Sequence, residues 1–425
     1  MKQLFIINSH VIDPANDVDA KINVLIKDGK VAELTTAKKL SEDVEIIDAK
    51  DAIVSPGFID LHCHLREPGQ EYKEDIASGS AAAAAGGFTS ICCMPNTNPV
   101  NDCAAVTDFI LQRARQVGLV KVYPVGAISK GLKGESLADI GDLANFGVVG
   151  VSDDGRPVMN SSLMRRAMEY ASSFNLPVIS HAEDLSLAGH GVMNEGATST
   201  ELGLAGIPAA AEDAMIARDI LLSSLTGAHL HIAHVSTAGG VEMVRQAKKL
   251  KLAVTCEATP HHFTLTEQAV HGYDPNTKVN PPLRSENDRN EVILGLADGT
   301  IDAIATDHAP HNIIEKELGF EDSAFGMIGL ETALPLSLKL VHDKKITLKR
   351  MVEALTIKPA QIFNLKAGSI GKGDIADIVI FNPKIPVTIQ SSEFKSKSRN
   401  TPFNGWHLLG KVLYTIVDGK IVFSQ

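Results

Sequence analysis

Short apolar runs alternate with longer amphipathic segments through the middle of this 425-residue chain. In the amphipathic segments, such as 161–174, 210–225 and 239–251, apolar residues recur at a spacing of three and four, as in helices that bury one face. The runs between them are short enough for strands of a buried sheet. We predict eight such strands, at 53–64, 89–95, 120–129, 147–154, 177–184, 228–236, 252–262 and 301–310.

Eight strands that alternate with helices indicate an α/β fold. A closed (β/α)₈ barrel of the TIM type accounts for the repeated units more economically than an open sheet does. The alanine run at 81–85 predicts a closely packed helix after the first strand, and Gly86-Gly87 predicts where that helix ends. We place the barrel at residues 56–365.

Both ends of the chain have a different pattern, in which strand-length runs are separated by tight turns. The runs lie at 4–13, 22–34, 44–57, 374–383 and 411–423. Asp28-Gly29 and Asp418-Gly419 are typical of β-hairpin turns. We predict that residues 1–55 and 366–425 form one small β-sandwich domain, with the barrel inserted between its two parts.

Composition narrows the classes of partner. The net charge of −11 disfavours nucleic acid or an anionic membrane surface. No apolar run approaches the roughly 20 residues that a membrane-spanning helix needs. An acidic protein can still bind an anionic small molecule, because one arginine can reverse the field inside a pocket.

Cysteine usage indicates a reducing compartment. The chain has five cysteines, an odd number, and no C-x-x-C pair. We interpret most of them as small buried hydrophobic residues and expect a cytoplasmic protein.

The first predicted barrel strand carries the most informative motif, Asp60-Leu61-His62-Cys63-His64. Side chains alternate between the two faces of a strand, so His62 and His64 point the same way, as a pair of metal ligands would. Two such histidines could equally be core residues. Further residues at the ends of later strands favour the metal: Asp153, Asp154, His181, His231, His234, His261, His262, Asp307, His308 and His311. Barrel chemistry sits at these strand ends, and imidazole with carboxylate suits zinc.

The order H-x-H, Asp, His, His, Asp resembles the amidohydrolase superfamily. Residues 60–99, with HLREPG and MPNTNP, more specifically resemble the class I dihydroorotases of bacteria, as do SDDG, PVISHAED, HIAHVST, KVNPPLR and ATDHAPH. The similarity covers nearly the whole chain. It implies a reversible, zinc-dependent cyclisation of N-carbamoyl-L-aspartate to (S)-dihydroorotate in de novo pyrimidine biosynthesis.

The resemblance also implies a set of metal ligands, for one or two zinc ions. Those of the first ion are His62, His64 and Asp307, those of the second are His181 and His234, and Asp154 bridges the two. Asp154 is chosen for its family spacing to His181, and Asp153 stays an alternative. A carboxylated lysine, the bridge in many relatives, is excluded because residues 141–155 contain no lysine.

The remaining expected roles concern the substrate. Asp307 is expected to move the proton between the attacking water and the leaving nitrogen. Arg66, two residues beyond His64 and expected at the rim of the pocket, can hold the substrate carboxylate by two hydrogen bonds. The full set of substrate contacts implied by the resemblance is His64, Arg66, Asn96, Asn280, His311, Phe325 and Gly326.

Some residues lack such a role. We interpret His231 as a buried structural histidine, and His308, His261 and His262 as partners that orient the ligands. Ala324 occupies a position where the family often has proline, and the loop at 312–324 is this chain's own sequence.

Two other functions were weighed. An allantoinase or dihydropyrimidinase acts on a ring without a carboxylate, so Arg66, Asn96 and His311 would lack a shared purpose. A non-catalytic dihydroorotase-like scaffold of aspartate transcarbamoylase would have lost metal ligands, whereas here every position is filled. A homodimer and an association with the transcarbamoylase are both compatible with the sequence.

Overall fold

The computed structural model describes residues 3–37 and 44–425 and contains a closed parallel barrel. Within these ranges the barrel has eight strands: β8 (Phe58–Cys63), β9 (Phe88–Cys93), β10 (Lys121–Pro124), β11 (Val151–Ser152), β12 (Val178–Ser180), β15 (Leu230–Ile232), β16 (Val254–Ala258) and β17 (Ala303–Ile304). They pair in chain order, and every pairing is parallel. The bridges Gly126 to Val151 and Cys63 to His308 close the ring. The predicted (β/α)₈ barrel is confirmed.

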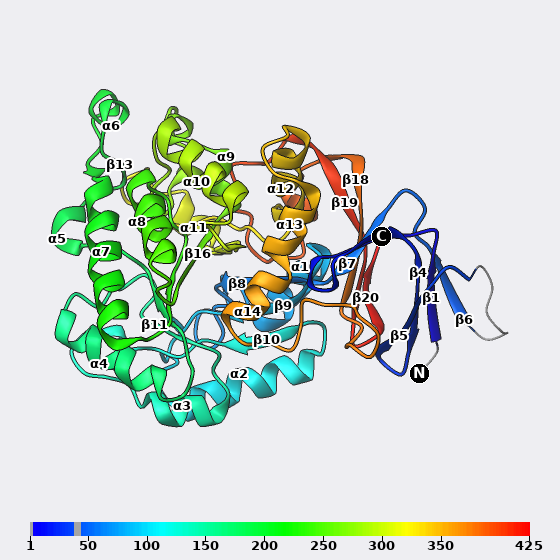
Figure 1. The fold of residues 1–425 in the computed structure, drawn as a ribbon. Coiled ribbons are helices and arrows are strands. Elements are labelled where there is room, and N and C mark those ends of the chain that lie inside the picture. The colour runs from blue at the N-terminus through cyan, green and yellow to red at the C-terminus, as the bar shows by residue number, and fades with distance from the viewer. Residues whose placement is uncertain (1–2, 38–43) are drawn as a thin grey trace.

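Helices surround the barrel (Figure 1). They are α1 (Ile76–Ala85), α2 (Ala104–Val117), α3 (Ile140–Phe146), α4 (Ser161–Ser172), α5 (Leu185–Ala188), α6 (Ala197–Leu202), α7 (Ala209–Thr226), α8 (Ala238–Lys249), α9 (Pro260–Thr264), α10 (Glu286–Asp298), α11 (Ile313–Lys316), α12 (Ala333–His342), α13 (Leu348–Leu355) and α14 (Ile357–Ile362). A short strand pair, β13 (Met193–Asn194) and β14 (Gly206–Ile207), extends between α5 and α7. Among the described residues, no helix is long and apolar enough to cross a membrane.

The alanine-rich helix α1 shows how local sequence sets an element's limits. Asp75 caps its first turn by accepting a hydrogen bond from the amide of Ser78. The helix ends at Gly86, and Gly87 follows at φ +88°, a conformation that glycine adopts without strain. The predicted end of this helix is confirmed.

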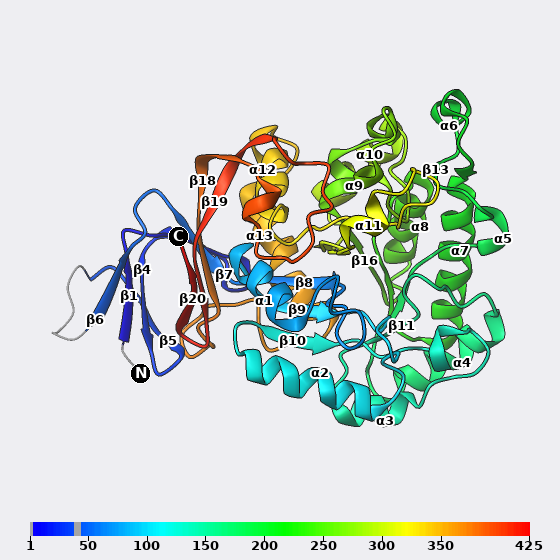
Figure 2. The ribbon, with the colours of Figure 1, turned by 180° about the vertical axis from the view of Figure 1, so that it is seen from behind.

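The two chain ends pack together as two sheets (Figures 1 and 2). One sheet has the order β5-β4-β1-β6 and the other β20-β19-β18-β7-β2-β3. Their bounds are β1 (Gln3–Ile7), β2 (His10–Asp13), β3 (Val18–Lys21), β4 (Asn23–Lys27), β5 (Lys30–Thr35), β6 (Val44–Asp48), β7 (Ile53–Pro56), β18 (Ile378–Thr388), β19 (His407–Val417) and β20 (Lys420–Ser424). Leu4, Val24, Val54 and Ile380, two from each sheet, lie in one buried cluster. The predicted sandwich is confirmed, while its boundaries at 55/56 and 365/366 stay predictions.

Most of the predicted barrel strands are longer than the observed ones, and three predicted runs show the physical reason. The run 4–13 is two strands in different sheets, separated at Asn8, which has φ +57°. The run 53–64 also divides, with β7 in the sandwich and β8 in the barrel. Gly57 stands between them, where a Cβ would lie 2.1 Å from the side chain of Thr89. The run 252–262 ends as a strand at Ala258, because the side chain of Thr259 caps helix α9.

Candidate metal centre and active site

Six predicted ligands converge at the carboxyl ends of the barrel strands. Each is buried and lies within or just after a strand: His62, His64, Asp154, His181, His234 and Asp307. His234 and Asp307 have φ values of +33° and +45°, which non-glycine residues rarely adopt. Such strain persists where surrounding structure imposes it, and it is concentrated at functional sites.

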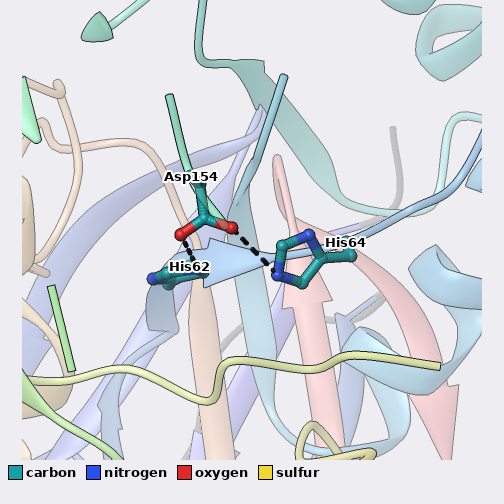
Figure 3. A group of neighbouring side chains, drawn as sticks. All are labelled: His62, His64 and Asp154. Atoms are coloured by element: carbon teal, nitrogen blue, oxygen red, sulfur yellow. Dashed lines mark ion pairs between the residues drawn. The ribbon is translucent and has the colours of Figure 1, made fainter. Parts of the chain in front are cut away.

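The first half of the cluster joins His62, His64 and two carboxylates. The Nε2 atom of His62 lies 3.3 Å from Oδ1 of Asp154, and that of His64 lies 3.6 Å from Oδ2 (Figure 3). Oδ1 of Asp307 is 3.1 Å from Nε2 of His64 and 3.6 Å from Nε2 of His62. Two imidazoles and two carboxylates therefore surround one point.

The second half shares Asp154 with the first. Nδ1 of His181 and Nε2 of His234 lie 3.6 and 3.8 Å from Oδ1 of Asp154. The two imidazole nitrogens are only 2.9 Å apart. In each of the two groups, His62–His64–Asp154 and Asp154–His181–His234, the ligand atoms lie within 4.8 Å of one another. Asp154 is thus placed to bridge two cations.

The chemistry of these donors fits a divalent metal. Nε2 of His62 and Oδ1 of Asp154 are buried polar atoms without a hydrogen-bond partner among the described residues. A buried polar atom without a partner is costly, so such atoms indicate a bound group. Burial raises the pKa values of Asp154 and Asp307, but the nearby histidines outweigh burial and hold both pKa values well below the usual range. Both carboxylates are therefore ionised, as metal ligands must be.

Asp153, the alternative bridge, turns away from the cluster. Its Oδ1 accepts hydrogen bonds of 2.8 and 2.9 Å from the amides of Ile128 and Ser129, and its Oδ2 accepts one from the Ser129 hydroxyl. Burial raises its pKa to about 6. The geometry favours Asp154 as the bridge, while Asp153 holds the loop after β10 by hydrogen bonds.

Asparagine substitutions should separate these two neighbours. Asp153→Asn should change stability by less than about 1 kcal/mol, because the amide oxygen can still accept from Ile128 and Ser129 and burial disfavours the charge that is lost, and it should leave metal content unchanged. Asp154→Asn should lose bound metal. Thermal unfolding and elemental analysis of the purified variants measure both effects. Metal loss in Asp153→Asn with full occupancy in Asp154→Asn would reverse the assignment.

A cavity of about 220 Å³ lies beside the metal cluster. Its lining includes all seven predicted substrate contacts: His64, Arg66, Asn96, Asn280, His311, Phe325 and Gly326. The structure therefore brings together residues that lie up to 262 positions apart, as Gly326 and His64 do. Their individual roles stay predictions.

Arg66 is buried rather than at the rim, which corrects the expectation from sequence. The residue is 8% exposed and has φ +62°. Its Nε donates to the carbonyl of Pro310 at 3.2 Å, and its Nη2 lies 3.4 Å from Nε2 of His311. In the described part of the chain, no carboxylate forms an ion pair with it. A buried cation without a counter-ion is costly, so the site is suited to an anion from outside.

The two asparagines that are predicted to contact the substrate also interact with other side chains of the protein. Oδ1 of Asn96 lies 2.9 Å from Nδ1 of His64, and its Nδ2 donates to Asp154 at 3.4 Å. Asn280 donates to Glu183 at 3.1 Å, and Glu183 lies 3.6 Å from Nε2 of His181. Both asparagines thus reach from the cavity to the metal cluster.

Two of the remaining histidines, His262 and His308, have structural partners, whereas the buried Nε2 of His261 has no hydrogen-bond partner among the described residues. His262 lies between the Thr259 hydroxyl and the carbonyl of Pro281, at 2.8 and 3.0 Å. His308 lies 3.3 Å from Glu74 and accepts from the amide of Gly329. In the two described ranges, neither imidazole bonds to a ligand side chain. The side chains therefore do not contact ligand side chains, but the carbonyl of His308 accepts a hydrogen bond of 2.9 Å from the amide of His64, and the orienting role stays a prediction.

The loop at 312–324 is held close to the cavity. Glu315 pairs with Lys73 at 2.9 Å and accepts from the Tyr72 hydroxyl at 3.2 Å. The amide of Ala324 donates to the carbonyl of Glu315 at 3.0 Å. Proline has no amide hydrogen, so alanine at position 324 permits a bond that the proline expected from the resemblance could not make.

Sequence reasoning missed Glu257. This carboxylate is 1% exposed, and its Oε1 lies 2.9 Å from Nδ1 of His62. A charged residue inside the apolar run 252–262 was the available signal, because charges are rarely buried without a partner.

Comparison with known proteins shows to which family the chain belongs. The amidohydrolase family matches residues 53–422, which is most of the chain. This chain belongs to the amidohydrolase family. Within the family its sequence groups with proteins named dihydroorotase. The relatives from Anaeromyxobacter dehalogenans and Geotalea daltonii are 54% and 52% identical and cover 99% of this chain, which spans 98% and 99% of their own lengths.

Solved structures show the same family fold. An L-hydantoinase (dihydropyrimidinase) from Arthrobacter aurescens superposes with a TM-score of 0.88 at 26% identity, over 100% of this chain and 96% of its own. A dihydropyrimidinase from Brevibacillus agri gives 0.87 at 24% identity, over 99% and 95% of the two chains, and shows the fold alone. Sequence identity is about twice as high to the dihydroorotases, so the predicted resemblance is confirmed.

Proposed function

We propose that this amidohydrolase is a dihydroorotase, which interconverts N-carbamoyl-L-aspartate and (S)-dihydroorotate in pyrimidine biosynthesis. Ring closure joins the carbamoyl nitrogen to a carboxyl carbon and releases water, and hydrolysis reverses this. One observation carries the proposal beyond the names of relatives: Arg66 is a buried cation without a carboxylate partner within the described ranges, and it lines the same cavity as the metal ligands. Both compounds carry the carboxylate that such a cation needs.

We further propose that the metal is zinc, in one or two copies. His62, His64 and Asp307 would hold one ion, His181 and His234 the other, and Asp154 would bridge them. Neutral imidazole and carboxylate are ligands that zinc commonly takes in hydrolases. When bound, zinc supplies Lewis acidity, polarising a carbonyl and lowering the pKa of water from about 15.7 to about 7.

The chain's own residues then supply proton transfer and orientation. In hydrolysis, Asp307 accepts a proton from the attacking water and returns it to the ring nitrogen as the amide bond breaks. Arg66 holds the substrate carboxylate by two parallel hydrogen bonds, with Asn96 and His311 beside it. Asn280 and the backbone at Phe325-Gly326 face the ring from another wall of the cavity.

A substrate comparison tests the proposal. Purified protein should cyclise carbamoyl aspartate and hydrolyse dihydroorotate, with at least 100-fold lower kcat/KM for dihydrouracil and hydantoin, because these rings lack a carboxylate for Arg66. This factor corresponds to about 2.8 kcal/mol, within the range for hydrogen bonds to charged groups. Comparable rates on the uncharged rings would move the assignment to the dihydropyrimidinases or allantoinases. If the metal-replete protein shows no turnover, the remaining interpretation is a non-catalytic scaffold of aspartate transcarbamoylase.

Metal removal should abolish activity and lower stability together. Chelation removes the cation that the buried ligands need, and a metal present at 100 times its Kd stabilises the folded state by about 2.7 kcal/mol. The expected result is an inactive protein with a lower Tm, both restored by zinc. Asp154→Asn is the control, and its Tm should respond less to the chelator. A chelated protein with full activity would contradict the metal-dependent mechanism.

Location and assembly stay proposals. All five cysteines are free thiols, which suits the cytoplasm. A homodimer and an association with aspartate transcarbamoylase are proposed on the family resemblance, and light scattering with and without the transcarbamoylase tests both.

A further inference from the structure

A line of hydrogen-bonding side chains runs through the barrel interior and ends at the metal cluster. It runs from His229, just before β15, through Thr255 and Glu257 of β16 and His231 of β15, to His62 of β8, and members two residues apart share a face of the strand. Nε2 of His229 lies 2.8 Å from the Thr255 hydroxyl, which lies 2.9 Å from Nδ1 of His231. Nε2 of His231 lies 3.1 Å from Oε2 of Glu257. Oε1 of Glu257 lies 2.9 Å from Nδ1 of His62.

The chemistry of Glu257 sets the direction of every bond in this line. Each carboxylate oxygen of Glu257 faces an imidazole nitrogen, Oε2 that of His231 at 3.1 Å and Oε1 that of His62 at 2.9 Å, and a carboxylate between two imidazoles only accepts. His231 must donate from Nε2, which leaves its Nδ1 to accept from the Thr255 hydroxyl. In the neutral form that can bind a metal, His62 donates from Nδ1 and its Nε2 keeps a lone pair.

That lone pair is aimed at the proposed metal. Nε2 of His62 is 3.3 Å from Asp154 and has no hydrogen-bond partner in the described part of the chain. With the proton on Nε2 instead, the ring could not bind a cation there. The other histidine of this site, His64, faces the neutral amide oxygen of Asn96 at 2.9 Å. The carboxylate of Glu257 therefore bonds to one histidine of the first metal site and to no histidine of the second.

We propose that Glu257, held in place by His231 and Thr255, is a positioning residue that fixes the tautomer and ring plane of His62 for the first metal ion. The inference rests on the proposed metal centre. Partners that orient a metal-binding histidine typically change metal affinity by 10- to 100-fold when they are removed. The consequence is selective: the site of His62 weakens, while the site of His181 and His234 does not.

Metal affinity, measured by chelator competition on apo-protein, tests this inference without relying on turnover. Asp307→Ala identifies the first site, because it removes a ligand that belongs to that site only. Glu257→Gln and Glu257→Leu should each weaken zinc at that same site by 10- to 100-fold, with the larger loss for leucine, which keeps bulk but accepts no hydrogen bond. Affinity at the second site should change less than threefold.

Two further variants separate positioning from general stability. Thr255→Val removes the hydroxyl but keeps the shape, and should weaken the first site by two- to tenfold through His231. Glu267→Gln is the matched control, because Glu267 accepts from Asn194 and Thr198 away from the cluster. It should leave both affinities unchanged. The Tm and circular dichroism of each apo-variant establish that it is folded.

Folded Glu257 variants with wild-type affinity at the first site would overturn the inference, and so would equal losses at both sites. Either result leaves the proposed function intact. Wild-type protein that binds no zinc would instead overturn the metal centre itself, so the two failures are distinguishable. If Glu257→Leu does not fold, Glu257→Gln and Thr255→Val decide the question.

Discussion

Replacement of Asp307 by asparagine is expected to lower kcat for carbamoyl-aspartate cyclisation by roughly 10²–10⁴-fold, the usual contribution of a general acid–base group. Asparagine has nearly the same shape but cannot accept and return a proton. Asp307 lies in the cluster at 3.1 Å from His64 and lines the substrate cavity. Asp307→Ala should lose at least as much, because it also removes a ligand atom.

The pH dependence of stability provides a second measurement of the same group. Nearby His62 and His64 hold the pKa of Asp307 well below its ordinary value of 3.8 in spite of burial. A lowered folded-state pKa stabilises the protein at pH values above 3.8, and this contribution disappears as the pH falls through the folded pKa. The Tm of apo wild-type protein should therefore decline more steeply below pH 4 than that of Asp307→Asn.

Steady-state kinetics with metal analysis distinguishes proton transfer from ligation. The exposed Asp298→Asn serves as a control for the loss of one charge, and its kcat should be unchanged. Wild-type turnover by Asp307→Asn would remove Asp307 as the proton carrier. A loss of activity that excess zinc fully restores would limit its role to metal binding.

Replacement of Arg66 should chiefly affect capture of the acidic substrate. In Arg66→Met, two charge-assisted hydrogen bonds to the carboxylate are lost. At about 1.5–3 kcal/mol each, their loss lowers kcat/KM for dihydroorotate by roughly 10²–10⁴-fold. Arg66→Lys should be intermediate, because an ammonium is a point charge that cannot form the paired bonds.

Two internal comparisons make the Arg66 prediction specific. Any slow hydrolysis of uncharged dihydrouracil should be nearly equal in wild type and Arg66→Met, since that ring offers no carboxylate. The substrate-free variant should be at least as stable as wild type, because methionine removes a buried cation that has no carboxylate partner in the described ranges. Equal losses on charged and uncharged rings would show that Arg66 supports the fold of the site rather than substrate choice.

Much of this architecture follows from patterns local to the chain. The hairpin turns form where Asp28-Gly29 and Asp418-Gly419 predict them, and all four residues have positive φ. His62 and His64 point to the same cluster, with ring centroids 5.4 Å apart, because strand alternation dictates it. The periodic helices α4, α7 and α8 lie within one or two residues of their predicted ranges.

Other features depend on contacts between distant segments. β11 spans only Val151–Ser152, so alternation no longer applies at Asp153 and Asp154. Hydrogen bonds from Ile128 and Ser129 turn Asp153 away from the cluster. Gly57 divides one apolar run between two domains because Thr89 from β9 packs against it.

The sequence by itself determined the barrel and the sandwich, because period-two and helical spacing act over a few neighbouring residues. The predicted set of ligand residues came from the resemblance to a family rather than from this spacing. Only the tertiary structure decided that Arg66 is buried and that Glu257 lies behind His62. Both depend on groups that approach from strands or loops nearly 200 or more positions away, such as the Pro310 carbonyl and the His311 side chain beside Arg66. No local pattern encodes such an approach, since it follows from the closure of the barrel.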